Sequence, residues 1–89
     1  MTQPITLSIK MFGAFRKYHQ GVLEVTVPSG STTSDVKTAL ATLLRQEHPQ
    51  LNDELISKSV LADNQRVLGT DEAITTPLAL AILPPVCGG

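Results

Sequence analysis

The sequence predicts a small α+β roll in which one main helix packs across a mixed β-sheet. Three observations lead to this fold class. Two segments near the N-terminus alternate apolar and polar residues, the middle of the chain carries an apolar stripe at helical spacing, and a near-continuous apolar run lies close to the C-terminus. A chain of 89 residues has room for one domain and not for two.

The first two strands are predicted by alternation. Residues 5–12 carry apolar side chains at odd-numbered positions, and Val22–Val27 also alternates and is rich in β-branched residues. Both segments are therefore expected to be half-buried strands that pair as a hairpin. Gly13 ends the first strand, residues 14–21 are expected to form a loop, and the turn residues at 28–31 close the unit.

The main helix is expected from residue 33 to about residue 47. Thr, Ser and Asp at 33–35 are good N-cap or first-turn residues, since their oxygens accept hydrogen bonds from unpaired helix N–H groups. Pro49 stops the helix. The apolar stripe that would face the sheet consists of Val36, Leu40, Leu43 and Leu44.

The elements that follow are short until the last strand. Residues 51–56 indicate one helical turn, and residues 59–62 and 66–68 are expected to be the arms of a tight hairpin. Its turn, Asp63–Gln65, contains residue types that tolerate left-handed backbone angles. The pair Ala73–Ile74 is too short to assign. The apolar run Leu78–Leu83 predicts a central strand buried on both faces.

Composition and charge argue against nucleic acid as a partner. The formal net charge is −1, and the seven basic residues are scattered among eight acidic ones, so no basic stripe is available to follow phosphates. Tyr18 is the only Tyr or Trp, which leaves no series of aromatic rings on which bases could stack.

Membrane and metal binding are not expected either. No apolar run approaches the ~20 residues that cross a membrane, and residues 1–10 lack the apolar core of a signal peptide. We therefore expect a soluble, cytoplasmic protein. His19 and His48 have no further ligands at metal-binding spacing. A domain this small cannot easily enclose a substrate pocket of the usual ~300 Å³, so a partner is expected to supply any reaction cavity.

The residues after the predicted last strand carry the strongest chemical signal. We expect a domain at residues 1–83 and an extended, flexible tail at residues 84–89. Prolines at 84 and 85 fix φ and remove backbone donors, so the chain leaves the sheet and extends away from the domain. The two terminal glycines lack a Cβ, so they can pass through a narrow channel and present a bare carboxylate.

This tail, Pro-Pro-Val-Cys-Gly-Gly, resembles the Pro-Pro-Val-x-Gly-Gly end of molybdopterin synthase small subunits, within the wider family of ubiquitin-like sulfur carriers. Residues 11–16 are similar to the family's aromatic and small residues at the end of the first strand, which an arginine soon follows. Asp63–Gln65 lies where the family has an Asn-containing turn. The resemblance implies a β-grasp, ubiquitin-like fold.

The resemblance also implies a mechanism. An adenylyltransferase similar to ubiquitin-activating enzymes uses ATP to convert the carboxylate of Gly89 to an acyl-adenylate, and a persulfide donor then supplies the sulfur of a thiocarboxylate. The tail inserts into the large subunit of a heterotetramer, where this sulfur passes to the cyclic pterin precursor of the molybdenum cofactor. The chain would then be a non-catalytic, sulfur-donating subunit that binds no cofactor stably and acts through a main-chain group.

The resemblance assigns the following site residues. The reacting residues are Gly89 and Gly88, and those that contact partners are Pro84, Pro85, Val86, Cys87, Phe12 and Leu83. Phe15 and Ile82 are considered for the same apolar docking face, with the hydrophobic core as the alternative.

The sequence departs from the family pattern at three places. The family more often has a small residue at position 87, so Cys87 is either tolerated there or takes part in thiol chemistry with Gly89 of another molecule or with a partner's cysteine. The family often has aromatic residues at 82–83 and an acidic turn at 75–77, where this chain has Ile-Leu and Thr-Thr-Pro.

Three alternative functions remain open at this point. The chain could carry sulfur for another product, such as thiazole, cysteine or a thiocarboxylate metabolite. It could be a protein modifier that is joined through Gly89 to lysines, or a β-grasp binding module with an inert tail. Neighbouring genes would separate the two kinds of carrier, and lysine-linked conjugates would identify the modifier.

Overall fold

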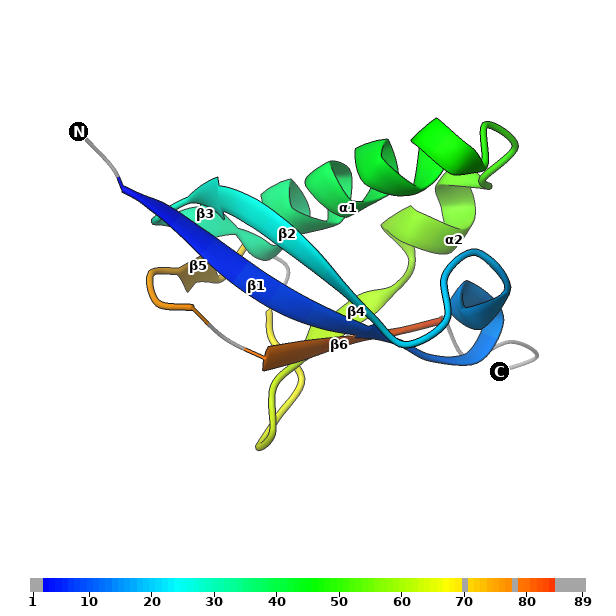
Figure 1. Ribbon diagram of the computed structural model, residues 1–89. Coiled ribbons are helices and arrows are strands. Elements are labelled where there is room, and N and C mark those ends of the chain that lie inside the picture. Colours follow the sequence, from blue (N-terminus) through cyan, green and yellow to red (C-terminus); the bar gives the residue numbers. More distant parts are fainter. Residues whose placement is uncertain (1–2, 70, 78, 85–89) are drawn as a thin grey trace.

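The computed structural model describes residues 3–69, 71–77 and 79–84. The α+β prediction is confirmed, because both α-helices lie on one side of the main sheet (Figure 1). The elements, in chain order, are β1 (Pro4–Met11), the 3-10 helix η1 (Gly13–Lys17), β2 (Val22–Pro28), β3 (Ser31–Thr32), α1 (Thr33–Glu47), α2 (Asp53–Ser57), β4 (Val60–Ala62), β5 (Ala73–Ile74) and β6 (Ala79–Leu83).

The main sheet is mixed, with the strand order β2-β1-β6-β4. β1 pairs antiparallel with β2 and parallel with β6, and β6 pairs antiparallel with β4. The predicted hairpin of the first two strands and the central position of the last strand are therefore confirmed. Residues 73–74, which the sequence left unassigned, form β5 and pair with β3 in a separate two-stranded ribbon.

The core lies between one face of the main sheet and α1. Leu7 and Ile9 of β1 are fully buried, as are Val36 and Leu40 of the helix. The odd-numbered residues of β1 all point into this core, as the alternation predicted. The even-numbered residues consequently point to the opposite face of the sheet, which no helix covers (Figure 1).

A capping box starts α1. Thr32, one residue earlier than predicted, is the N-cap: its hydroxyl accepts a hydrogen bond from the Asp35 N–H at 3.2 Å, and the Asp35 carboxylate accepts one from the Thr32 N–H at 3.1 Å. The predicted position of Leu43 in the core is wrong, since its side chain is 36% exposed. Leu43 lies at the edge of a buried stripe centred on Leu40 and Leu44.

The segment predicted as a loop at residues 14–21 begins with η1. Phe15 is completely buried, and its N–H donates to the Phe12 carbonyl at 3.1 Å to close the first 3-10 turn. A single turn is too short to show a periodicity in the sequence, which is why the prediction missed η1. The burial of the Phe15 ring holds this turn against the core.

The last strand is buried on one face only, which corrects the prediction of two buried faces. Leu80 and Ile82 point into the core, whereas Ala79 is exposed and Ala81 is half-buried. Helices cover only one side of the sheet, and short alanine side chains on the other side made the run look uniformly apolar. Leu78, the first residue of the predicted strand, lies outside the described residues.

The turn at residues 63–65 forms as predicted, but for a different reason. The Asp63 N–H donates to the Arg66 carbonyl at 3.0 Å, and the Leu68 N–H donates to the Leu61 carbonyl at 2.8 Å. No described residue other than glycine has a positive φ, so left-handed angles do not make this turn. The Asp63 carboxylate stabilises the turn instead, because it accepts hydrogen bonds from the N–H groups of Gln65 and Arg66 at 2.8 and 2.9 Å.

Candidate functional site

The tail junction, which we define as Leu83 and Pro84, lies at the end of the central strand β6. In the register of the sheet, Met11 of β1 lies beside Ile82 and Val60 of β4 lies opposite Leu83. Ile82 is fully buried, whereas both residues of the tail junction are half-buried. Ile82 therefore anchors the strand in the core, and Leu83 faces the uncovered side of the sheet.

Most of the predicted site residues, both the reacting and the partner-binding ones, lie outside the described part of the chain. These are Pro85, Val86, Cys87, Gly88 and Gly89. Their assigned functions stay predictions. The structure does place the strand to which they are attached, so the start of the tail is fixed relative to the sheet.

The uncovered side of the sheet forms a shallow cavity of about 350 Å³ beside the tail junction. Its apolar part comes from β2, β4 and β6, and from the residue that follows β1. We call this surface the exposed face; the cavity is lined by Ser8, Lys10, Phe12, Val22, Ala62, Asp63, Asn64, Ala79, Leu80 and Ala81.

Phe12 is the most prominent aromatic side chain on the exposed face. It is 37% exposed, and the Lys10 ammonium lies 5.2 Å from the centre of its ring. Val22, 52% exposed, lies opposite Lys10 in the antiparallel register. The exposed face therefore combines an apolar surface with one cation, an arrangement suited to protein contact.

Two residues considered for docking belong to the core instead. Phe15 and Ile82 are both 0% exposed, so neither can contact a partner without unfolding of the domain. Phe12 and Leu83, in contrast, are at least partly exposed. The structure thus separates two aromatic residues only three positions apart: Phe12 keeps an extended backbone and lies on the exposed face, whereas Phe15 belongs to the 3-10 turn and enters the core.

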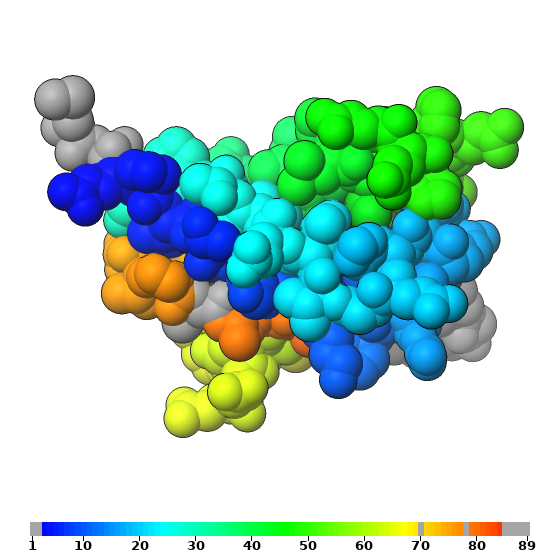
Figure 2. All heavy atoms as spheres, viewed as in Figure 1, coloured from blue at the N-terminus to red at the C-terminus, as the bar shows by residue number. Residues whose placement is uncertain are grey.

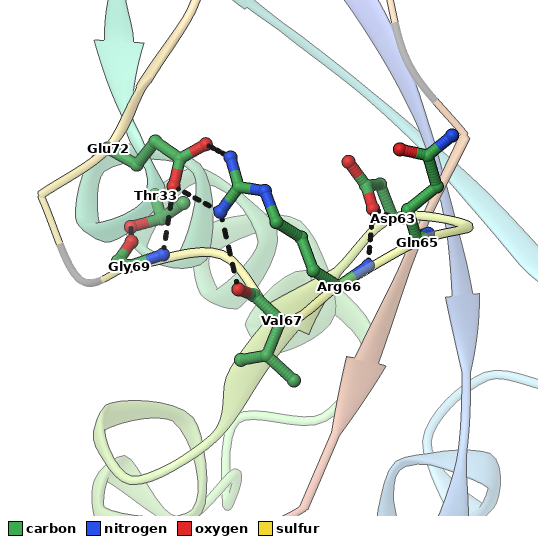
Figure 3. Close-up of polar contacts among 7 residues, drawn as sticks. All are labelled: Thr33, Asp63, Gln65, Arg66, Val67, Gly69 and Glu72. Atoms are coloured by element: carbon green, nitrogen blue, oxygen red, sulfur yellow. Dashed lines mark hydrogen bonds and ion pairs between the residues drawn. The ribbon is translucent and has the colours of Figure 1, made fainter.

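A polar network holds the loop that follows the projecting hairpin at residues 63–66, which appears in yellow at the bottom of Figure 2. The Arg66 guanidinium pairs with the Glu72 carboxylate through both of its terminal nitrogens, one of them at 2.9 Å (Figure 3). Glu72 also accepts the Gly69 N–H at 3.1 Å, and the Thr33 hydroxyl donates to the Gly69 carbonyl. The loop is thereby tied to the start of α1.

These contacts shift three pKa values. The hydrogen bond from Arg66, followed by that from the Gly69 N–H, lowers the pKa of the Glu72 carboxyl, and the same pair raises the pKa of Arg66. The backbone N–H groups of Gln65 and Arg66 lower the pKa of Asp63. Both carboxylates are therefore stabilised in their charged forms by local contacts.

The groove between α1 and α2 is a second cavity, of about 310 Å³, but its cations are already paired. The Lys37 ammonium donates to the carbonyls of Ser57 and Ser59 at 3.1 and 3.0 Å, and Arg45 forms an ion pair with Asp53. Partial burial lowers the pKa of Lys37. These contacts join the two helices and leave no cation aimed into the groove to bind a ligand.

Within the described ranges, no group of three or more His, Cys, Asp or Glu side chains could hold a metal ion. His19 instead contacts the Val22 carbonyl through Nε2 at 3.1 Å, and His48 packs edge-on against the Tyr18 ring. Nor does the described chain contain a helix long and apolar enough to cross a membrane.

Sequence reasoning missed part of the exposed face. Val22 and Ala62 contribute to it, although neither stands near Phe12 in the sequence. Alternation shows which residues share a face within one strand, but the strand order and register decide which strands lie side by side. Gly13 was also assigned only as a strand end, yet it contacts Pro84.

Comparison with known proteins supports the predicted family. The ThiS family profile matches residues 9–89. Small archaeal modifier protein 1 from Haloferax volcanii has 23% identity and a TM-score of 0.69, with 94% of this chain and 99% of that chain covered. The protein of that name from Methanosarcina acetivorans has 20% identity and a TM-score of 0.60, with coverage of 98% and 99%.

A third solved structure is a candidate molybdopterin converting factor, subunit 1, from Pyrococcus furiosus. It has 22% identity and a TM-score of 0.65, with 92% of this chain and 99% of that chain covered. None of the curated protein sequences matches this chain. The structural similarities confirm the predicted β-grasp fold, and the family match, which covers most of the sequence, establishes that this chain belongs to the ThiS family of ubiquitin-like β-grasp proteins.

Proposed function

We propose that the chain is the sulfur-carrying small subunit of a molybdopterin synthase and that it reacts through the carboxylate of Gly89. The observation that carries this proposal is the sequence Pro-Pro-Val-Cys-Gly-Gly directly after the central strand of a ThiS-family domain. The similarity to a candidate molybdopterin converting factor subunit supports it. No described side-chain cluster offers a competing reaction centre.

The chemistry follows from the weakness of a carboxylate as an electrophile. An adenylyltransferase joins Gly89 to AMP and releases pyrophosphate, and the terminal sulfur of a persulfide then attacks the carbonyl carbon as AMP leaves. A second thiol cleaves the sulfur–sulfur bond and frees the thiocarboxylate, whose sulfur is an effective nucleophile at neutral pH. After transfer of the sulfur to the cyclic pterin precursor, water regenerates the carboxylate.

The exposed face gives this tail a docking platform. Phe12 and Val22 line the cavity beside the tail junction, and Leu83 belongs to the junction itself, so a partner that contacts these residues would receive the tail next to its own binding surface. We propose that the adenylyltransferase and the synthase large subunit both dock here, and that two copies of each subunit form a heterotetramer. In this proposal the domain binds no cofactor of its own, and the adenylyltransferase uses the ATP. We place the reaction in the cytoplasm, where ATP is available to that enzyme.

The test is the mass of the C-terminal peptide after incubation with ATP, an adenylyltransferase and a persulfide donor. Cys87 is alkylated first and the peptide is sequenced, since oxidation of Cys or Met gives the same nominal mass shift as exchange of oxygen for sulfur. The proposal expects the shift on Gly89. An unmodified Gly89, under conditions in which an established carrier is loaded, would reject it.

One further function is favoured by a specific observation. Two of the similar structures are small archaeal modifier proteins, and a terminal Gly-Gly carboxylate suits conjugation as well as sulfur transfer. Lysine-linked conjugates of this chain, absent from a Gly89 deletion, would identify a modifier. Loading of Gly89 with sulfur but no transfer to the pterin precursor would instead indicate a carrier for another acceptor.

A further inference from the structure

Gly13 and Pro84 contact each other, although they lie at opposite ends of the sequence. Gly13 begins η1, with only Phe12 between it and the end of β1, and Pro84 directly follows β6. β1 and β6 are parallel neighbours, so their C-terminal ends lie at the same edge of the sheet, where η1 packs beside the end of β6 (Figure 1). The proline ring occupies the space beside the Gly13 Cα.

Two independent features restrict position 13 to glycine. Its φ is +56°, in the left-handed region that side chains disfavour. A Cβ built on Gly13 would also lie 2.6 Å from Cγ and 3.1 Å from Cδ of Pro84. The proline ring is bonded to its own backbone nitrogen and cannot rotate aside, so a side chain at 13 must change the pucker of the ring or displace the backbone of Pro84 or that of η1.

Both sides of this contact are held rigidly. Phe15 fixes η1 to the core, and its carbonyl accepts the N–H groups of Tyr18 and His19 at 3.0 and 3.2 Å. On the other side, the fully buried Ile82 fixes the end of β6. Since Pro84 precedes another proline, its own ψ is also confined to extended values. The orientation of Pro84 therefore determines the direction in which the chain leaves the domain.

We propose that Gly13 is a positioning residue for the tail: its missing side chain lets Pro84 pack against η1, and this contact directs the tail toward the partner's reaction site. The inference rests on the proposed sulfur-carrier function. It assigns Gly13 no chemistry, because the residue acts on Gly89 only through Pro84.

Gly21 and Gly30 provide matched controls. Both have a φ of +91°, so alanine at either position also adopts an unfavourable backbone conformation. A Cβ at these positions would meet nothing within 4 Å. Gly13→Ala therefore differs from Gly21→Ala and Gly30→Ala mainly in the clash with Pro84.

The experiment measures kcat/KM for adenylation of the tail, with each variant as the substrate of the adenylyltransferase and at a temperature at which all variants are folded. We expect Gly13→Ala to lower this value by about tenfold to a hundredfold, as misplacement of a reacting group by about 1 Å does. Pro84→Ala should cause a similar loss, and the double variant should be no worse than either single one. Gly21→Ala and Gly30→Ala should remain within about twofold of the wild type.

Equal losses in Gly13→Ala and Gly30→Ala would overturn the inference, as would fully additive losses in the double variant. A wild type that is never adenylated would reject the proposed function, but not the positioning itself. NMR then provides a second readout. In the wild type, the Gly13 Hα should lie close to the Pro84 ring. The dipolar couplings of residues 86–89 should change in Gly13→Ala and stay unchanged in Gly30→Ala. Absent proximity or unchanged couplings would overturn it.

Discussion

The two faces of β1 differ in what they contribute to the protein. Odd-numbered residues such as Leu7 and Ile9 are fully buried against α1, whereas even-numbered residues such as Ser8 and Lys10 line the exposed face beside the tail junction. Adjacent residues of one strand thus support stability on one side and a docking surface on the other. Because the side chains alternate strictly, mutations on the two faces should have separable effects.

The largest effect on stability is expected from the buried face. Leu7→Ala should lower the free energy of unfolding by about 3 kcal/mol, because it removes a fully buried side chain and leaves a cavity in a small core. Urea denaturation measures this loss. Ser8→Ala, one residue further along the strand, is the control and should change stability by less than about 0.5 kcal/mol. Similar losses in both variants would contradict the division between the faces.

The exposed face should show the opposite behaviour. Phe12→Ala should weaken binding to the adenylyltransferase by about tenfold, because it truncates the main aromatic side chain of the proposed docking surface. Its free energy of unfolding should fall by less than about 1 kcal/mol, since the ring is partly exposed. Titration calorimetry measures the affinity. Thr6→Val, at the distant end of the same face, is the control, and an equal loss of affinity there would argue against a docking site at Phe12.

A smaller effect is expected from the Arg66–Glu72 pair, which belongs to neither face. The pKa of Glu72 is lowered in the folded state, so its contribution to stability is present above the ordinary glutamate pKa of about 4.3. This contribution should disappear as the pH falls below that value. Glu72→Gln should therefore lose less stability than the wild type over the same acidic range, as measured by thermal melts at a series of pH values.

Asp63→Asn serves as a control for that series. The pKa of Asp63 is lowered by backbone N–H groups and not primarily by Arg66, so its removal should leave the part of the pH dependence due to Glu72 in place. If Glu72→Gln and the wild type respond to acid identically, the ion pair makes no contribution to folding.

The smallest effect is expected in the tail itself, at Cys87. Cys87→Ala should leave sulfur loading of Gly89 within about twofold of the wild type, because a side chain that only passes through a partner's channel needs to be small rather than reactive. Mass spectrometry of the C-terminal peptide measures the loading. A loss of tenfold or more would instead show that the Cys87 thiol takes part in the chemistry.

Much of the fold could be read from local patterns. Alternation in residues 5–12 and 22–27 predicted β1 and β2, and the apolar run before the prolines predicted the central strand. The pattern failed for Leu43, which lies at the edge of the helical stripe, and for the outer side of β6, where small alanines resemble a buried face. In both cases burial depends on contacts with a neighbouring layer, and the periodicity of a single element gives no information about those contacts.

The sequence by itself determined the fold class, the family and the terminal Pro-Pro-Val-Cys-Gly-Gly on which the proposed chemistry depends, because each is encoded in consecutive or regularly spaced residues. Only the tertiary structure decided that Phe12 faces outward while Phe15 enters the core, and that Gly13 meets Pro84. These outcomes depend on the parallel pairing of β1 with β6, which joins segments about seventy residues apart. Such long-range register is set by the packing of the whole domain, and no local stretch of the chain specifies it.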